Sequence, residues 1–555
     1  MVEQSERAIA MSFIQAAPRL PHPWREDRTL RTWLPRVLPE PLRRDAEASL
    51  VALGDYAVHA YARQTTSTPT EPVLTQWDAW GNRIDRIELT ETWREGPAIA
   101  ARHGLVADGH DRALGEFARV QQFAKVYLYH AASAFYSCPL AMTDGVATAL
   151  RDAANAPLRE RVLPHLLSRD PATFWISGQW MTENTGGSDV GGSETVARRD
   201  ADGTWRLSGR KWFTSAIHAE VALALARPEG NPAGADGLAL FCIETRTADG
   251  SWNGITIDRL KDKLGTRELP TAEIHLCDTR AELAGDAANG VRAIAPVLQV
   301  TRLWNAFGSL STMRRCLALT RDYAQRRQAF GRPLIEQPLF ADALAGWEAE
   351  FEAAFALAME VALLLGRVES GAGDARDAAL HRLLTPLAKL WICKLGVRIA
   401  SETVEAIGGI GYLEDSGIPL LLRDAQVFPI WEGASNVQAL DFLRALDKLG
   451  IDPIVDAVDG ALEDADGVVA DTDAEAIHRA VRHADTWLRD HAREPDALQA
   501  GSLRLGVTCA RALAAALLGR HATWRQREQN DAQPVAALHR FCGHGLDRIL
   551  DARDA

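Results

Sequence analysis

Apolar residues recur at helical spacing over two long parts of this 555-residue chain. In the first part, residues 46–172, the period is clear at Phe117, Val120 and Phe123, which would share one face of a helix. The same period returns in the second part, residues 286–447, which includes a long stretch rich in Ala and Leu. The pattern predicts two separate helical domains.

The region between them, residues 173–285, has the spacing of strands. Residues 204–208 alternate between apolar and polar after an Asp-Gly pair, and short apolar runs at 221–226 and 238–243 are separated by Pro and Gly. The sequence has no glycine fingerprint of the kind that joins a strand to a helix in dinucleotide-binding domains. We therefore expect a central antiparallel β domain and no nicotinamide site.

The two ends of the chain differ from these domains. Residues 1–45 are rich in Pro and Arg, a composition that breaks long helices, so we expect an N-terminal arm extended over a neighbouring subunit. Residues 448–555 have helical spacing again and begin with an acidic stretch that would be a solvated link or helix face. The whole pattern predicts an α+β, mostly helical protein with an extra helical domain at its C-terminal end.

Composition narrows the function classes. The 61 Lys and Arg residues against 74 Asp and Glu residues give a formal net charge of -13, which repels nucleic acid and anionic membranes. The seven cysteines do not have the spacing of metal ligands, so we expect neither a metal site nor a disulfide framework. Because the sequence shows no leader-like N-terminus and no uncharged stretch of membrane length, a soluble cytoplasmic protein is expected.

A motif late in the second helical region points to chemistry. Glu432 is a lone carboxylate in Ile430-Trp431-Glu432-Gly433, an apolar and small-residue setting. Such a setting disfavours the charged form of a carboxylate and makes it a stronger base, as removal of a proton from carbon requires. Residues 181–190 form a second motif that joins hydroxyl groups to a glycine pair, and backbone N–H groups beside glycines can hold a flavin edge and a pyrophosphate.

Four motifs together resemble the acyl-CoA dehydrogenase family, over roughly residues 174–446. In chain order they are residues 181–189, 211–215, 323–331 and 408–433. Within the family, the chain is most similar to the AidB-like branch of adaptive-response flavoproteins. The resemblance implies a helical N-terminal domain, a central antiparallel β domain and a C-terminal four-helix bundle, with FAD as the cofactor.

The resemblance also carries cofactor contacts to numbered residues of this chain. In the β domain and beside the base they are Met181, Thr182, Gly187, Ser188, Phe213, Thr214, Ser215, Ile430 and Trp431. Among these, Phe213 and Ser215 stand where the family has a Trp and a Thr. Residues expected to reach the FAD of a neighbouring subunit are Arg327, Phe330, Gly408, Gly409, Ala434 and Asn436. A site shared between subunits implies a homotetramer arranged as a dimer of dimers.

Glu432 takes the family's base position, where it would remove the α-proton of an acyl-CoA thioester while a hydride leaves the β-carbon for flavin N5. Arg302 matches a helix Arg near this centre, although an ion pair on the helix surface is the alternative for it. Relatives that carry the base on this helix have an acid at the position of Thr301, which cannot act as a base. Nitroalkane oxidases share the fold but use an Asp in the Glu432 motif.

A second hypothesis comes from the AidB-like branch, for which DNA binding in an alkylation response is proposed, with weak or vestigial dehydrogenase activity. DNA binding requires a basic face. Residues 451–555 instead carry 12 Arg and no Lys against 18 Asp and Glu. A focused patch would have to come from Arg504, Arg511, Arg520, Arg525, Arg527, Arg540 and Arg548. The charge disfavours DNA as a partner, so the sequence favours the enzyme.

Overall fold

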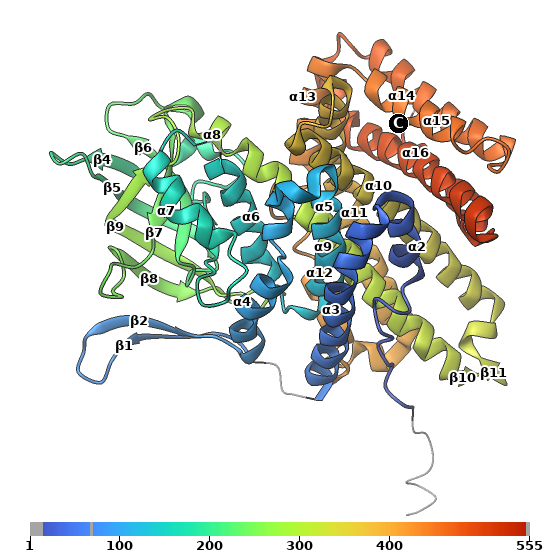
Figure 1. Cartoon of the computed structure of the whole chain (residues 1–555), viewed down its shortest axis with the longest axis horizontal. Coiled ribbons are helices and arrows are strands. Elements are labelled where there is room, and N and C mark those ends of the chain that lie inside the picture. Colours follow the sequence, from blue (N-terminus) through green and yellow to red (C-terminus); the bar gives the residue numbers. More distant parts are fainter. Residues whose placement is uncertain (1–14, 67–69, 152, 551–555) are drawn as a thin grey trace, which may run out of the picture.

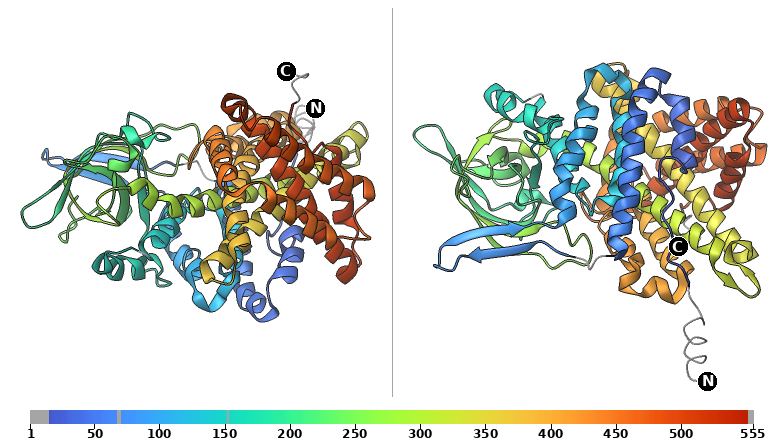
Figure 2. Two further views of the ribbon diagram at one scale, coloured as in Figure 1. Left: turned by 90° about the horizontal axis from the view of Figure 1, so that it is seen from above. Right: turned by 60° about the horizontal axis from the view of Figure 1, so that its bottom comes forward.

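The structure is a computed structural model that describes residues 15–66, 70–151 and 153–550. A β domain lies at one end of the molecule and the C-terminal helices lie at the other, with the remaining helices between them (Figure 1). The view from above shows the same order of parts (Figure 2).

The N-terminal helical domain is built mainly of long helices, and α5 is its fully buried centre. Its helices are α2 (Arg28–Val37), α3 (Glu40–Thr66), α4 (Glu91–His103), α5 (Ala118–Tyr129), α6 (Ser137–Arg151) and α7 (Ala156–Leu166). Short 3-10 turns join several of them, at Ala107–His110, Arg112–Phe117 and His130–Ala132. The predicted helical character of this region is confirmed.

The N-terminal segment differs from the extended arm predicted for it. Residues 1–14 lie outside the described residues, but α2 and the start of α3 make much of the rest helical. The Asp27 carboxylate caps α2 by accepting a hydrogen bond from the Leu30 N–H at 3.1 Å. Trp33 is buried and makes an edge-on ring contact with Phe355 at 6.3 Å between centroids. This burial stabilises the helix despite Pro35 in its last turn.

A two-stranded hairpin interrupts the N-terminal helices, and the helical pattern did not predict it. It pairs β1 (Val73–Trp77) with β2 (Arg83–Glu88) and projects from the helices beneath the β domain (Figure 1). Gln76 Nε2 donates to the carbonyl of Ile257 at 2.8 Å, so the hairpin is joined to the β domain.

The β domain has the position and the mostly antiparallel pairing that the sequence predicts. Its strands are β3 (Ser177–Trp180), β4 (Val196–Arg199), β5 (Trp205–Ser215), β6 (Val221–Pro228), β7 (Ala239–Glu244), β8 (Ile255–Leu260) and β9 (Thr271–Leu283). Strand β6 pairs with both β4 and β7, so the sheet closes on itself. The pairings of β3 and β4 with β6 are parallel, a departure from a purely antiparallel domain. Its interior is filled by side chains such as Phe241, Ile257 and Ile274.

The C-terminal bundle has the helical period that the sequence predicts. Its main helices are α9 (Ala295–Arg326), α10 (Pro338–Ser370), α11 (Ala375–Ile407) and α13 (Ser435–Leu449), with the shorter α8 (Gly290–Ala293) and α12 (Ile418–Ala425). The short pair β10 (Gln328–Ala329) and β11 (Arg332–Pro333) joins α9 to α10. Two 3-10 turns, Gly408–Tyr412 and Glu414–Ser416, join α11 to α12.

The extra C-terminal domain packs against α10, α11 and α13 of the bundle. It consists of α14 (Asp452–Glu463), α15 (Asp471–Asp490), α16 (Pro495–Gln529) and α17 (Gln533–Gly543). The acidic stretch predicted as a link or helix face is therefore largely helical. By length and composition α16 could cross a membrane, but 83% of its apolar window is buried inside the protein, which is typical of a core helix.

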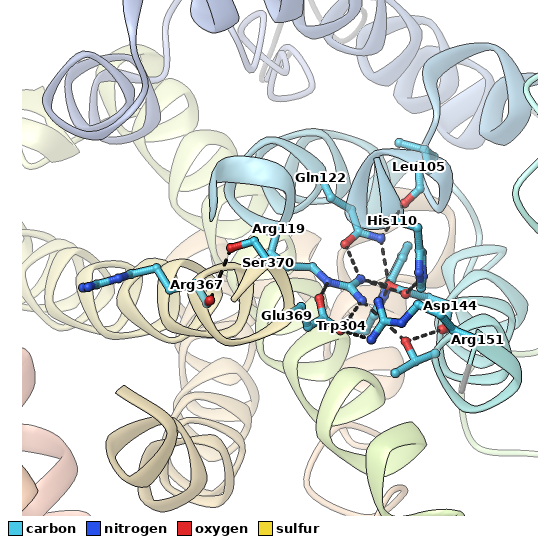
Figure 3. Close-up of polar contacts among 11 residues, drawn as sticks. Leu105, His110, Arg119, Gln122, Asp144, Arg151, Trp304, Arg367, Glu369 and Ser370 are labelled. Carbon is cyan, nitrogen blue, oxygen red and sulfur yellow. Dashed lines mark hydrogen bonds and ion pairs between the residues drawn. The ribbon is translucent and has the colours of Figure 1, made fainter. Parts of the chain in front are cut away.

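A buried network of charges fixes the N-terminal domain to the bundle (Figure 3). The Asp144 carboxylate on α6 accepts hydrogen bonds from Arg119 Nη1 on α5 and from Trp304 Nε1 on α9, each at 2.8 Å. His110 Nε2 lies 2.8 Å from the same carboxylate. Arg119 also pairs with Glu369 on α10. Burial alone would raise the pKa of Asp144, but Arg119 and His110 hold it well below its usual range.

Candidate active site

Glu432 lies in the irregular segment between α12 and α13. Its backbone has a φ of +55°, a left-handed conformation that is costly for a side chain other than glycine, and Gly433 follows with a φ of +95°. A Cβ at Gly433 would lie 2.6 Å from Gln438 Nε2, so this position requires glycine. The surrounding residues therefore have to hold Glu432 in a strained conformation.

Three side chains hold the backbone carbonyls of Glu432 and Gly433. Gln438 Nε2 donates to the carbonyls of Glu432 at 2.8 Å and Gly433 at 3.0 Å. Lys389 Nζ, from α11, also donates to the Gly433 carbonyl, at 2.6 Å. Arg302 Nε, from α9, reaches the Glu432 carbonyl at 3.4 Å. Such strain is typical of functional sites.

The Glu432 carboxylate points toward α9. Its Oε2 accepts a hydrogen bond from the Thr301 hydroxyl at 2.8 Å. Thr301 is buried where α9 packs closely against α6. A Cβ added at Gly145 of α6 would lie 3.4 Å from Thr301 Cγ2. Thr301, which cannot itself act as a base, thus donates the hydrogen bond that orients the Glu432 carboxylate.

Arg302 is buried rather than exposed on the helix surface. Its Nη1 pairs with Asp441 Oδ2 at 2.6 Å, and Arg382 pairs with the same carboxylate. Burial alone would raise the pKa of Asp441, but these two arginines hold it below its ordinary value. Arg302 therefore forms an ion pair, but a buried one and not the surface pair considered as the alternative, and it also contacts the backbone of Glu432.

The β-domain residues predicted to hold a cofactor come together from two segments. The Trp212 N–H of β5 donates to the Thr182 carbonyl at 2.9 Å, which places the loop after β3 beside β5. A Cβ at Gly187 would lie 2.7 Å from Thr182 Oγ1, so the loop closes only with glycine there. Met181 is buried beneath this loop, and Ser188 is exposed on it. The backbone of this loop is thus available to a ligand.

The predicted contacts on β5 are placed unequally. Phe213 is 49% exposed, whereas Thr214 is buried and its hydroxyl donates to the Ala272 carbonyl of β9 at 2.7 Å. The Ser215 hydroxyl lies 3.1 Å from the Thr271 hydroxyl. The Phe213 ring is therefore partly open to a ligand, with Lys261 Nζ 4.3 Å from the ring centroid, while the Thr214 hydroxyl is used by the sheet.

Two charged residues that the motif analysis did not select hold this cradle in place. Lys211 and Glu183 form a buried ion pair at 2.6 Å, and Glu183 also accepts from the Thr195 hydroxyl and the Glu194 N–H. Burial alone would raise the pKa of Glu183, but Lys211 keeps it below its usual value. In the sequence, only the positions of Glu183 and Lys211 inside the motifs at residues 181–189 and 211–215 indicated that they belong to this site.

The remaining predicted cofactor residues lie away from this cradle. Phe330 is 96% exposed in the β10–β11 turn, and that turn lies at the opposite end of the molecule from the β domain (Figure 1). Gly408 and Gly409 are exposed at the end of α11, while Ala434 and Asn436 are exposed at the start of α13. A single chain does not bring Arg327 and Phe330 to its own β domain.

Family models match three of these domains. The family model described as "Acyl-CoA dehydrogenase, C-terminal domain" matches residues 288–446, and the middle-domain model matches residues 178–279. The model "Adaptive response protein AidB N-terminal domain" matches residues 19–171. The chain belongs to the acyl-CoA dehydrogenase family.

Individual relatives agree with this assignment. Acyl-CoA dehydrogenase family member 11 of Caenorhabditis elegans is 42% identical over 451 residues, which cover 80% of this chain and 73% of that protein. The putative acyl-CoA dehydrogenase AidB of Escherichia coli is 35% identical over 68% of this chain and 69% of its own length. The solved structure of Caenorhabditis elegans ACDH-11 in complex with C11-CoA matches with a TM-score of 0.92 at 35% identity, covering 97% of this chain and 94% of that one.

As a family member, the chain is a flavin-dependent oxidoreductase with FAD as its cofactor. Its own residues fit that group. The loop at Gly187 exposes backbone, and Phe213 and Ile430 present apolar surface, both at least 49% exposed. Trp431 Nε1, beside Glu432, is buried without a hydrogen-bond partner among the described residues, so it is a donor available to a ligand.

Four of the seven arginines that would form a DNA-binding patch pair with acids of the protein, whereas Arg504, Arg527 and Arg548 are exposed. Arg511 is buried and pairs with Glu350 at 2.6 Å, and Arg520 pairs with Glu360 at 2.5 Å. Arg540 pairs with Asp342, and Arg525 is buried against Asp531. These contacts join the C-terminal domain to α10 or close its own turns. These four arginines are therefore not free to bind phosphates.

Proposed function

We propose that the protein is an FAD-dependent acyl-CoA dehydrogenase in which Glu432 removes the α-proton of an acyl-CoA thioester. The hydrogen bond from Thr301 to the Glu432 carboxylate carries the proposal, because it fixes the direction of the only acid in residues 430–433. The strained backbone at Glu432 and the three side chains that hold it support the same role.

The residues of the chain divide the work. Thr301 orients the carboxylate, while Arg302 and Gln438 fix its backbone, so that the base meets the α-carbon without reorganisation. The Glu432 N–H would polarise the thioester carbonyl and stabilise the negative charge that develops there. Bound FAD supplies the acceptor for the hydride that leaves the β-carbon. Removal of a proton from carbon is the difficult step, and Glu432 is the residue that would perform it.

The substrate class follows from the relatives. The ACDH-11 structure contains C11-CoA, and this chain covers 94% of that protein at 35% identity. We therefore propose an acyl-CoA with a medium or long chain. The position of Arg327 and Phe330, at the far end from the β domain, supports FAD contacts between subunits and hence the homotetramer.

Anaerobic titration tests the function. The purified holoprotein should lose its long-wavelength flavin absorbance when acyl-CoAs of graded length are added. Glu432→Gln should keep the flavin and the fold but lose this bleaching, because the nearly isosteric amide cannot take a proton. The control variant is Asp456→Ala, which changes a residue on the surface. Asp441→Asn would not serve as a control, because Asp441 pairs with Arg302. Unchanged bleaching by Glu432→Gln would move the base to another residue.

The second hypothesis, a DNA-associated flavoprotein, gains no support from the contacts of the C-terminal arginines. If it were correct, duplex DNA would bind tightly at physiological salt, and Arg-to-Ala changes at exposed positions such as Arg504 would abolish binding. We expect weak binding that is lost steeply as salt rises. Fluorescence anisotropy with labelled DNA distinguishes the two results.

A further inference from the structure

A cavity lies near the Glu432 site, behind the ring of Phe135. Its volume is about 500 Å³. The Phe135 ring stacks on Phe428 at 5.6 Å and lies 6.0 Å from the ring of Trp431, the residue before Glu432. One aromatic layer therefore separates this cavity from the catalytic motif.

Most of the cavity wall is apolar. Phe135, Ala134, Leu319, Leu420 and Leu421 line it, together with the ring of Tyr61. A wall of this kind fits a hydrocarbon chain.

Arg315 is one of the charged residues in this wall. It lies on α9, is 2% exposed and lines the cavity. Its Nη1 donates to Gln64 Oε1 at 2.9 Å, but Nε and Nη2 have no hydrogen-bond partner among the described residues. Burial and the neighbouring Arg314 lower the pKa of Arg315 to about 10, so it remains charged at neutral pH. A buried cation with two unpaired donors is costly unless a ligand pairs with it.

The two unpaired groups determine the kind of ligand. Nε–H and one Nη2–H leave the same edge of a guanidinium in parallel, and this edge matches the two oxygens of a carboxylate. One guanidinium neutralises the single charge of a carboxylate, whereas a phosphate dianion would keep excess charge in an apolar wall. His130, also on the wall, does not add a second cation, because burial lowers its pKa to about 3.

Acidic residues also line the cavity, but each of the following already has a partner. Glu71 pairs with Arg267, and Glu414 pairs with Arg423. Asp424 accepts a hydrogen bond from the Thr266 N–H at 2.6 Å. Glu268 accepts from the Thr90 hydroxyl, and burial raises its pKa to about 7, which reduces its negative charge. Arg315 is thus the cation on this wall that lacks an acid.

We propose that this cavity binds an apolar chain that ends in a carboxylate, with the carboxylate held side-on by Arg315. Two sources share this chemistry. One is a free fatty acid, which would bind next to the active site. The other is an acyl-CoA whose chain passes Phe135 and carries a carboxylate at its far end, and this source rests on the proposed function. Along α9, Arg315 lies about 21 Å from Thr301 by the helical rise, so only a long chain spans both sites.

Binding to the holoprotein tests the shared chemistry without any turnover. Calorimetry with dodecanoate and with dodecan-1-ol compares a carboxylate with an uncharged end of the same chain. The parent should bind dodecanoate more tightly, and Arg315→Met should weaken dodecanoate by roughly tenfold to a hundredfold while leaving the alcohol unchanged. Arg267→Met removes another cation of the same wall, one that is paired, and should leave both ligands unchanged.

Other results of this binding experiment would overturn the proposal. It fails if dodecanoate binds Arg315→Met as tightly as it binds the parent, or if the alcohol and the acid bind the parent equally. Should Arg315→Met not fold, Arg315→Lys keeps the charge without the side-on pair and should still lose most of the preference for the acid. A crystal of the parent with dodecanoate should place the carboxylate on Arg315, and a carboxylate elsewhere contradicts the proposal.

A kinetic experiment distinguishes the two sources. It compares kcat/KM for octadecanoyl-CoA, a chain long enough to reach Arg315, and for the same thioester carrying a terminal carboxylate. A preference for the carboxylate-ended thioester that Arg315→Met removes identifies the substrate, whereas no preference, with acid binding intact, identifies a free fatty acid. If no thioester is turned over at all, the proposed function fails while the binding experiment still decides the role of Arg315.

Discussion

Helix α9 carries two buried arginines with opposite surroundings. Arg302 pairs with Asp441 and reaches the Glu432 backbone, so its charge is compensated within the chain. Arg315, on the same helix, has two donors without a partner among the described residues. The first arrangement is typical of a residue that holds a site in place, and the second of a residue that awaits a ligand. Pairing, rather than burial, distinguishes the two roles.

The largest effect should come from removing a compensated charge. Asp144→Ala leaves Arg119 buried with a lost partner, and we expect a loss of about 3–5 kcal/mol in the local free energy of unfolding. Amide hydrogen exchange of α5 and α6 measures it. Asp456→Ala removes an exposed pair with Arg376 and should cost less than about 1 kcal/mol. Equal losses of stability from Asp144→Ala and Asp456→Ala would show that pairing of a buried charge does not have the importance assigned to it here.

The ion pair between Asp144 and Arg119 predicts that stability depends on pH. The pKa of Asp144 in the folded protein lies below its ordinary value, so its stabilisation is complete above the unfolded pKa of about 3.9 and is lost as the pH falls below it. The difference in stability between the parent and Asp144→Ala should therefore be constant from pH 7 to 5 and shrink on further acidification. Denaturant unfolding at a series of pH values measures it, and a difference that does not shrink at all between pH 5 and pH 2 contradicts this assignment.

The sequence predicted the regular parts of the fold better than the contacts. Strong periods identified α9, β6 and β7 because burial of one face determines such patterns. Helix α2 escaped prediction since its stability comes from packing against α10 and the C-terminal domain, as at Trp33, and not from its own composition. The β1–β2 hairpin escaped because its strands are short and largely exposed.

The candidate site shows the same limit. The motif located Glu432, but its hydrogen bond to Thr301 joins residues 131 positions apart and depends on how α9 packs against the segment before α13. In the sequence, Arg315 is one of two adjacent arginines in a helix, a pattern more often found on a solvated face. Only the structure shows that it is buried beside a cavity.

A smaller effect should follow from the hydrogen bond that orients the base. Thr301→Val removes the hydroxyl but keeps the shape, and we expect flavin reduction by an acyl-CoA to slow by about tenfold, since a hydrogen bond to a charged group is lost. Thr301→Ser keeps the hydroxyl and should reduce the flavin at close to the parent rate. Stopped-flow absorbance measures both variants. A Val variant as fast as the Ser variant would show that the hydrogen bond has no part in positioning.

The smallest effect on stability should come from Arg315→Met. The change removes an uncompensated buried charge and one hydrogen bond, so these costs offset each other and the free energy of unfolding should stay within about 1.5 kcal/mol of the parent. Thermal unfolding without added ligand measures it. A loss as large as that of Asp144→Ala would show that Arg315 holds the fold together, and the comparison along α9 would then fail.

The central claim is that Glu432 removes a proton from the α-carbon of an acyl-CoA. Incorporation of deuterium at that carbon tests it most directly, because exchange with the solvent requires the base but no net oxidation. Under anaerobic conditions in D₂O, the holoprotein should exchange the α-hydrogens of dodecanoyl-CoA, detected by mass spectrometry. Glu432→Gln should bind the thioester without exchange, and exchange at the parent rate by this variant would contradict the account.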